Sequence, residues 1–128
     1  VLTTANYFET GVDETSGIIL KNPDGEMAVM ALTMRAKQPK RGVVAGEKGF
    51  IEICEYPRAQ KATVTYTEDG RTEVIEEGKT EEALQYEVRD MQDYVLNHSG
   101  QENLQIIRDV MQVLTAVRNQ WGMSYPFE

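Results

Sequence analysis

The hydrophobic pattern is densest at residues 27–34, where every residue except Thr33 is apolar. Alternate residues of a strand point to opposite faces, so a strand with one face in water alternates apolar and polar residues. A strand covered on both faces is instead a near-continuous apolar run. We therefore expect a strand over residues 26–35 that is covered on both sides, and the rest of the chain to supply its neighbours and its covers.

Glycine-containing turns divide the first part of the chain into hairpins. Pro and Gly favour tight turns because Pro presets φ and Gly accepts positive φ. Asn22-Pro23-Asp24-Gly25 predicts a hairpin of residues 15–21 with the apolar run, and residues 1–8 form a further strand. Gly46-Glu47-Lys48-Gly49 predicts a second hairpin, and Glu68-Asp69-Gly70-Arg71 a third. The strands expected in these two hairpins cover residues 41–45 and 50–54, and residues 61–67 and 72–76.

The apolar period changes to that of a helix after residue 80. Thr80 is a candidate capping hydroxyl, and the two acids that follow it suit the positive end of a helix. The stripe that follows is spaced i, i+4, i+7 and i+11 and consists of Leu84, Val88, Met91 and Val95. Ser99 and Glu102 have the spacing of a capping box for a second helix, and Gly122 is its expected end.

Strands first and helices last predict an α+β fold: a mostly antiparallel, open-faced sheet with two C-terminal helices packed on one face. Two helices cover one face only, so a second subunit or another domain is expected on the other. The alternative is a sheet curled around its own core. The candidate subunit interface is one face of the apolar run: Met27, Val29, Ala31, Thr33 and Arg35. The other face then packs on the helices, and a one-residue error in the register would exchange the two sets.

Composition limits the class of protein. The 128 residues fit a single domain with an ordinary balance of 41% hydrophobic and 27% charged residues. A net charge of −8 argues against a nucleic-acid partner, because phosphate binding needs clustered Lys and Arg. A single cysteine excludes an internal disulfide. Neither a signal peptide nor an apolar segment of about 18 residues is visible, so we expect a cytoplasmic protein without a membrane partner.

Few residues are candidates for chemistry. His98 is expected at a helix end, where it complements the helix dipole, and Cys54 is expected to be an inert, partly buried thiol. Asp13 with Glu14 is interpreted as a polar loop rather than an acid–base pair. A small basic group is interpreted as solvated loop residues: Lys37, Lys40, Arg41 and Lys48. The sequence thus predicts no catalytic, cofactor-binding or metal-binding residue on this chain.

Several short motifs together resemble a known family. They are Gly11-Val12-Asp13-Glu14, the apolar strand, Gly46-Glu47-Lys48-Gly49-Phe50-Ile51, Tyr86-Glu87, Arg118-Asn119-Gln120-Trp121-Gly122 and Tyr125-Pro126. In this order they resemble the C-terminal domain of the glucose–fructose oxidoreductase / inositol dehydrogenase (Gfo/Idh/MocA) family, and within it the dimeric dihydrodiol dehydrogenase type. The resemblance covers essentially the whole chain.

The resemblance implies a larger parent enzyme. Family members bind NAD or NADP on an N-terminal Rossmann domain, which this chain does not contain, and their C-terminal sheet helps to wall the substrate site and forms a dimer interface. The family's cofactor glycines and its Glu-Lys-Pro lysine motif precede the point where this chain begins. Residues 1–128 are therefore expected to be a substrate and dimerisation domain that is inactive alone. The parent would be a dehydrogenase of a sugar, polyol or dihydrodiol hydroxyl. The alternative is a stand-alone α+β module for small-ligand binding or oligomerisation.

Overall fold

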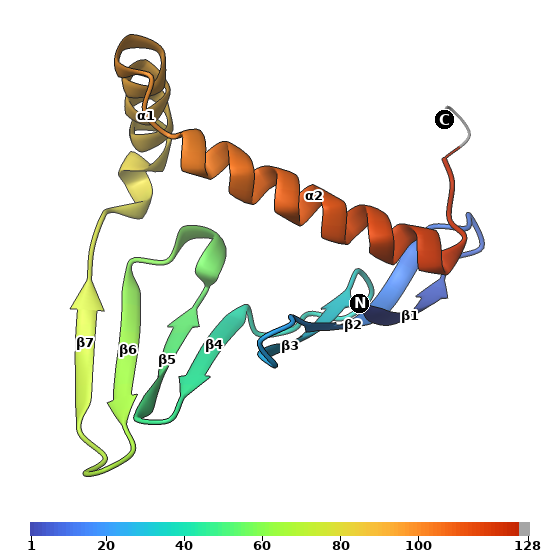
Figure 1. The fold of residues 1–128 in the computed structure, drawn as a ribbon, viewed down its shortest axis with the longest axis horizontal. Helices are drawn as coiled ribbons and strands as arrows, with labels where there is room; N and C mark the ends of the chain where they lie inside the picture. Colours follow the sequence, from blue (N-terminus) through green and yellow to red (C-terminus); the bar gives the residue numbers. More distant parts are fainter. Residues whose placement is uncertain (126–128) are drawn as a thin grey trace. The chain divides into compact units, whose positions relative to one another are not determined.

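Among residues 1–125, which the computed structural model describes apart from the side chain of Gln101, seven strands precede two α-helices (Figure 1). The strands are β1 (Leu2–Tyr7), β2 (Asp13–Lys21), β3 (Met27–Thr33), β4 (Arg41–Gly46), β5 (Gly49–Cys54), β6 (Lys61–Tyr66) and β7 (Thr72–Glu76). The helices are α1 (Ala83–Asn97) and α2 (Gln101–Trp121), with short 3₁₀ turns η1 (Tyr56–Arg58) and η2 (Thr80–Glu82). Pro126, which contributed to the resemblance, lies outside the described residues.

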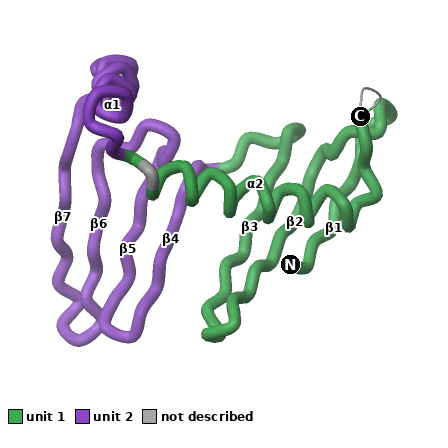
Figure 2. The backbone as a smooth tube through the Cα atoms, turned by 45° about the horizontal axis from the view of Figure 1, so that its top comes forward, with its two compact units in different colours: residues 1–38, 100–128 green, residues 39–99 purple. Residues whose placement is uncertain are grey.

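The chain divides into two compact units, shown in different colours in Figure 2. Unit 1 contains residues 1–38 and the segment from Gly100 onward, and unit 2 contains residues 39–99. All strand pairs are antiparallel, in the order β1-β2-β3 in unit 1 and β4-β5-β6-β7 in unit 2. The α+β class and the antiparallel pairing predicted from the sequence are confirmed.

Unit 1 has a small core where α2 crosses one face of its sheet (Figure 2). Ile18 of β2 is 3% exposed and Val117 of α2 is 2% exposed. The end of the helix is tied to β1, because the Trp121 indole N–H donates to Thr3 Oγ1 at 3.0 Å. Gly122 then ends the helix with φ of 63°, as predicted.

Unit 2 is a four-stranded meander that none of its own elements covers. Figures 1 and 2 both show α1 beyond the ends of these strands rather than across the sheet. The link between them is η2, where the Lys79 N–H donates to the Tyr86 hydroxyl at 3.0 Å and Tyr86 donates to Glu82 at 3.2 Å. Among the described residues, those assigned as buried all lie in unit 1.

The predicted hairpins form at the predicted turns. Asn22 N–H and Gly25 N–H close the first turn, and Gly25 has φ of 93°. The single sheet expected from the sequence is wrong in one respect, since the strands form two hydrogen-bonded sheets and β3 is an edge strand. Residues 34–40 join β3 to β4 in the sequence, and Pro39 in this segment lacks the amide donor that a strand ladder needs. The expectation that both helices pack on one sheet face is therefore also wrong. Helix α2 crosses the sheet of unit 1, whereas α1 lies beyond the ends of the strands of unit 2 (Figure 2).

Both predicted helix caps are wrong in detail. The Thr80 hydroxyl donates to the Arg58 carbonyl at 3.1 Å instead of capping a helix. Gly100, not Ser99, is the N-cap of α2, with φ of 74°. The Ser99 hydroxyl instead donates to Asp93 at 2.5 Å, because the preceding helix offers it a charged acceptor.

Candidate subunit interface

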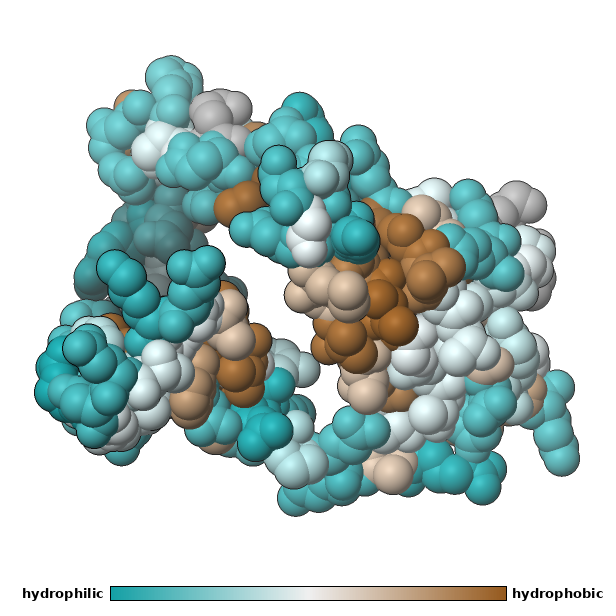
Figure 3. All heavy atoms as spheres, turned by 60° about the horizontal axis from the view of Figure 1, so that its bottom comes forward, coloured by the Kyte–Doolittle hydropathy of each residue, from teal (hydrophilic) through white to brown (hydrophobic). Residues whose placement is uncertain are grey.

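The apolar run forms one open face of the unit 1 sheet, which we call the Val29 face. It consists of the β3 residues Met27, Val29, Ala31 and Thr33 with their β2 partners Lys21, Ile19, Gly17 and Thr15. Val29 is 72% exposed. Figure 3 shows hydrophobic residues gathered on unit 1. Among the described residues of unit 1, no element covers this face, because α2 lies on the other side with Ile18.

The register divides the apolar run between the two faces. Met30 pairs with the buried Ile18, and Leu32 pairs with the buried Ser16, so both share the face that α2 crosses. The four predicted interface residues within the strand therefore lie together on the side away from α2. Whether a second subunit contacts them stays a prediction.

Arg35 differs from the other four predicted residues. It lies beyond the end of β3, where strand alternation no longer fixes its direction. Its guanidinium forms an ion pair with Glu14 and lies 5.9 Å from the centre of the Phe8 ring. Unit 1 thus supplies partners for Arg35 itself. Glu14, which was expected in a polar loop, lies in β2 and is held in this ion pair.

A threonine pair forms the polar end of the Val29 face. The hydroxyls of Thr15 and Thr33 lie 3.1 Å apart, and Thr33 Oγ1 also accepts from the N–H groups of Arg35 and Ala36 at 3.2 Å each. These bonds satisfy the Thr33 hydroxyl at the point where the strand ends. An apolar surface with an internally satisfied polar end resembles the anatomy of a protein interface.

Unit 2 carries a second uncovered apolar surface, which the sequence analysis did not single out. We call it the Val44 face; its apolar residues are Val44, Ile51, Ile53, Ala62, Val64 and Ile75. Val44 is 73% exposed. The alternation of β5 and β6 was the available signal, but it becomes a face only once the register is known.

The opposite face of the same sheet is mixed in character. Val43 shares it with Glu52 and Thr63, and Arg41 pairs with Glu52 at 3.4 Å. Arg41, part of the basic group noted in the sequence, is therefore engaged in an ion pair. This mixture is typical of a face that water can cover.

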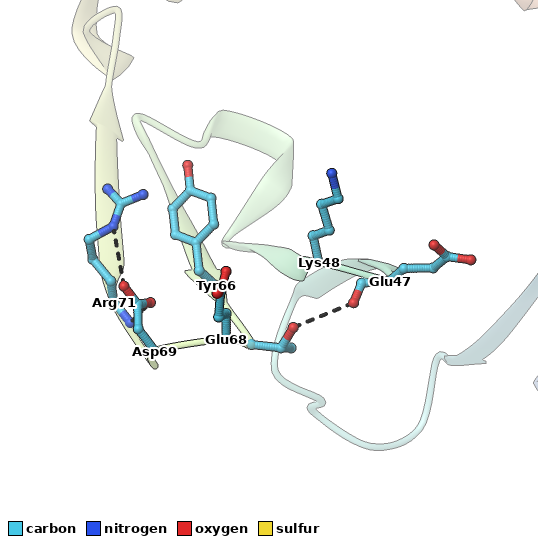
Figure 4. Close-up of a pocket in the computed structure, with 7 residues that line it drawn as sticks. Glu47, Lys48, Tyr66, Glu68, Asp69 and Arg71 are labelled. Atoms are coloured by element: carbon cyan, nitrogen blue, oxygen red, sulfur yellow. Dashed lines mark hydrogen bonds and ion pairs between the residues drawn. The ribbon is translucent and has the colours of Figure 1, made fainter.

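A pocket lies at the turn end of unit 2, between the two hairpin loops (Figure 4). Arg71 lies 4.1 Å from the centre of the Tyr66 ring and 3.9 Å from Glu73, and the Tyr66 hydroxyl donates to Glu73 at 3.1 Å. The Thr67 N–H donates to the Lys48 carbonyl at 3.0 Å, which joins the two loops. The charged groups are exposed, and Arg71 is engaged by Asp69 and Glu73, so the pocket is interpreted as a loop network.

The other candidate residues are not brought together. His98 is exposed at the end of α1 with φ of 53°. Cys54 was expected to be partly buried but is exposed, because it is the last residue of β5. Hydrogen bonds from Ser99 and then from Asn97 lower the pKa of Asp93 below its ordinary value of 3.8. Within residues 1–125, no group of three or more His, Cys, Asp or Glu side chains is placed to hold a metal ion. No helix in the described part of the chain has both the length and the hydropathy to cross a membrane.

One comparison with curated proteins connects part of the chain to an enzyme. A segment of 48 residues is 40% identical to the trans-1,2-dihydrobenzene-1,2-diol dehydrogenase of Xenopus laevis. The segment is 38% of this chain and spans 14% of that enzyme's length. No family profile matches the chain. No solved structure matches it at a significant level. Part of the chain is thus similar to an oxidoreductase, a dihydrodiol dehydrogenase.

Proposed function

We propose that this chain is the C-terminal domain of an NAD(P)-dependent dehydrogenase of the Gfo/Idh/MocA family. The observation that carries the proposal is the 40% identity of a segment to a dihydrodiol dehydrogenase. The order of the short motifs along the whole chain supports the same family. The parent enzyme would transfer a hydride between the nicotinamide and a hydroxyl-bearing carbon of a sugar, polyol or dihydrodiol.

The cofactor is assigned to an N-terminal Rossmann domain of the parent protein. Dinucleotide binding uses glycines between a strand and a helix, so that the pyrophosphate meets the helix N-terminus. Gly46 and Gly49 instead flank a turn between the two antiparallel strands β4 and β5. These residues do not fit a dinucleotide, so no step of the hydride transfer is assigned to this chain.

The chain itself is proposed to supply a subunit contact and part of the wall of the substrate site. The Val29 face is apolar, uncovered within its unit and free of charged residues apart from Lys21 at its border. Burying such a surface against a second copy removes apolar area from water, which stabilises the dimer by about 25 cal/mol for each Å² buried. We assign it to the homodimer interface of the parent enzyme, and propose that the domain also helps to wall the substrate site.

The test starts from the coding sequence upstream of Val1. We expect it to encode a βαβ unit with Gly-x-Gly-x-x-Gly and, further on, Glu-Lys-Pro. The complete gene product is then assayed at 340 nm with NAD⁺ or NADP⁺ and a panel of trans-dihydrodiols, inositols and aldoses, with the 128-residue chain as the inactive control. A start codon immediately upstream, or a complete protein that oxidises none of these compounds, would favour the stand-alone binding or oligomerisation module.

A matched pair of variants tests the interface separately from the chemistry. Val29→Asp places a charge on the open face, whereas Met30→Asp places it on the face that α2 crosses. We expect Val29→Asp to weaken dimerisation and leave the fold intact, and Met30→Asp to unfold unit 1. The reverse result would mean that the two faces are exchanged.

A further inference from the structure

Unit 2 contains a further pocket between the turns η1 and η2, at the start of α1, which we call the Arg58 pocket. Its volume is about 350 Å³, within the range of roughly 300–1,000 Å³ that is usual for small-molecule sites. The lining residues that give it its chemistry are Tyr56, Pro57, Arg58, Glu77, Lys79 and Tyr86. All of them belong to unit 2, so the pocket does not depend on how the two units are placed.

Hydrogen bonds hold the two sides of the Arg58 pocket together. The Thr80 hydroxyl donates to the Arg58 carbonyl at 3.1 Å, which joins η2 to η1. The Glu77 N–H donates to the Gln60 carbonyl at 3.0 Å. The turn η1 follows Glu55, which has φ of 52°, a conformation that is uncommon outside glycine and that is found most often at functional sites. A pocket formed before its ligand arrives loses less conformational entropy on binding.

Arg58 differs from Arg71, the arginine of the pocket in Figure 4. Each pocket is lined by an arginine and a tyrosine. Arg71 is engaged by Asp69 and Glu73 of its own unit. The Arg58 side chain is exposed and has neither an ion pair nor a hydrogen bond within the described part of the chain. The guanidinium of Arg58 is therefore available to a ligand, whereas that of Arg71 already has carboxylate partners.

The side chains of the Arg58 pocket suit an anionic ring compound that also carries hydroxyl groups. A guanidinium binds a carboxylate or a phosphate through two parallel hydrogen bonds. Lys79, the other cation of the lining, lies 3.1 Å from the Glu82 carboxylate and is paired. Glu77 can accept hydrogen bonds from ligand hydroxyls. Tyr56, which is 55% exposed, offers a ring face to the apolar side of a ligand.

We propose that the Arg58 pocket forms part of the substrate site and binds the carboxylate or phosphate of an anionic sugar, with Arg58 as the specificity-determining residue. The inference rests on the proposed function and narrows its substrates to sugars that carry such a group. The hydroxyl-bearing carbon loses a hydride to NAD⁺ or NADP⁺ and its hydroxyl loses a proton, so that C–OH becomes C=O. The anionic group is unchanged, and neutral sugars of the same configuration are weaker substrates.

Matched sets of a hexose, its uronate and its 6-phosphate are the probes, in the gluco, galacto and manno configurations. With the complete gene product, we expect one anionic sugar to have a kcat/KM about tenfold or more above that of its neutral hexose. Comparing the uronate with the 6-phosphate shows which anionic group is recognised. A neutral hexose that is oxidised at least as well as both of its anionic forms in every set overturns the proposal.

Substitutions of Arg58 test its role in the same assay. Arg58→Gln should raise KM for the anionic sugar about 10- to 100-fold with a smaller change in kcat, because the group it binds is not the reacting one. Arg58→Lys keeps the charge and should restore part of the loss. Arg89→Gln, which removes an exposed arginine of α1 outside the pocket lining, is the matched control. An unchanged ratio of anionic to neutral kcat/KM in Arg58→Gln contradicts the proposal.

A binding measurement separates this inference from the proposed function. In NMR titrations of the 128-residue chain, we expect the anionic sugar to shift the amide signals of Arg58 and Lys79, its neutral hexose to leave them unchanged, and Arg58→Gln to abolish the shifts. A complete protein that oxidises neutral compounds without preferring anionic sugars leaves the proposed function standing and overturns this inference. If the complete protein has no dehydrogenase activity, the proposed function fails. Shifts that depend on Arg58 would then support the anion site, and their absence would overturn it.

Discussion

The two units have antiparallel sheets built from similar hairpins, but only unit 1 has a core. Its helix is anchored at the end, where the Trp121 indole and the Gln120 amide bond to Thr3 and to the Val1 carbonyl. That anchor holds Val117 in a position where it is buried. In unit 2, α1 contacts η2 and leaves its stripe exposed. A regular hairpin pattern thus determines which strands pair, whereas a few contacts between residues far apart in the sequence decide which face of the sheet is covered.

The largest effect expected within one chain is at the core of unit 1. Ile18→Ala removes a side chain that is 3% exposed, so it should reduce the free energy of unfolding by about 2–5 kcal/mol. Ile19→Ala makes the same change on the Val29 face and should cost less than about 1 kcal/mol in the monomer. Urea denaturation followed by circular dichroism measures both. Equal losses would mean that the two faces of this sheet are equally covered.

A smaller effect is expected at Gly49, where β5 pairs with β6. A Cβ on Gly49 would lie 2.3 Å from the Thr65 carbonyl oxygen, which is main chain and cannot rotate away. Gly49→Ala should therefore destabilise the protein by about 1–3 kcal/mol. Gly42→Ala is the control, because nothing lies within 4 Å of a Cβ there. Thermal melts compare the two variants, and a neutral Gly49→Ala would show that this hairpin is not fixed.

The anchor of α2 should contribute about as much as one hydrogen bond. Trp121→Phe keeps an aromatic ring but removes the N–H that donates to Thr3, so we expect a loss of about 0.5–1.5 kcal/mol. Thr3 also donates to the Gly17 carbonyl at 2.9 Å, so Thr3→Ser, which keeps the hydroxyl, is the matched control. A double-mutant cycle with Thr3→Val isolates the pair. A coupling energy of zero would contradict the anchor.

The smallest effect concerns the junction at the end of α1. Ser99 and Asn97 stabilise the charged form of Asp93, so its pKa is lower in the folded chain than in the unfolded chain. The stabilisation is therefore present above pH 3.8 and is lost as the pH falls through the lower, folded value. NMR titration should show the Asp93 pKa rising in Ser99→Ala. An Asp93 pKa that does not respond to Ser99→Ala would rule out this hydrogen bond in solution.

The sequence was sufficient for features that are encoded locally. Alternation with Pro and Gly turns predicted each hairpin, and helical spacing predicted both helices, because these signals involve residues a few positions apart. Gly122 ended α2 for the same reason. Local patterns also placed Met27, Val29, Ala31 and Thr33 on one face of their strand.

The features that the sequence missed depend on distant partners. Residues 27–34 suggested a strand covered on both faces, yet β3 is an edge strand of its sheet and the Val29 face is uncovered within unit 1. Arg35 was assigned to a face by alternation, but Glu14 holds it in an ion pair. Ser99 was expected to cap α2 but bonds to Asp93 instead. Arg35 and Ser99 each had more than one possible partner, and sequence spacing alone did not show which partner each would bind.

The most direct test of the account is sedimentation equilibrium of the 128-residue chain across the micromolar range. If the Val29 face is a contact between subunits, a species of twice the chain mass is expected at high micromolar concentration. A monomer at high micromolar concentration would contradict this assignment, because the Val29 face would then be stable in water without a second copy.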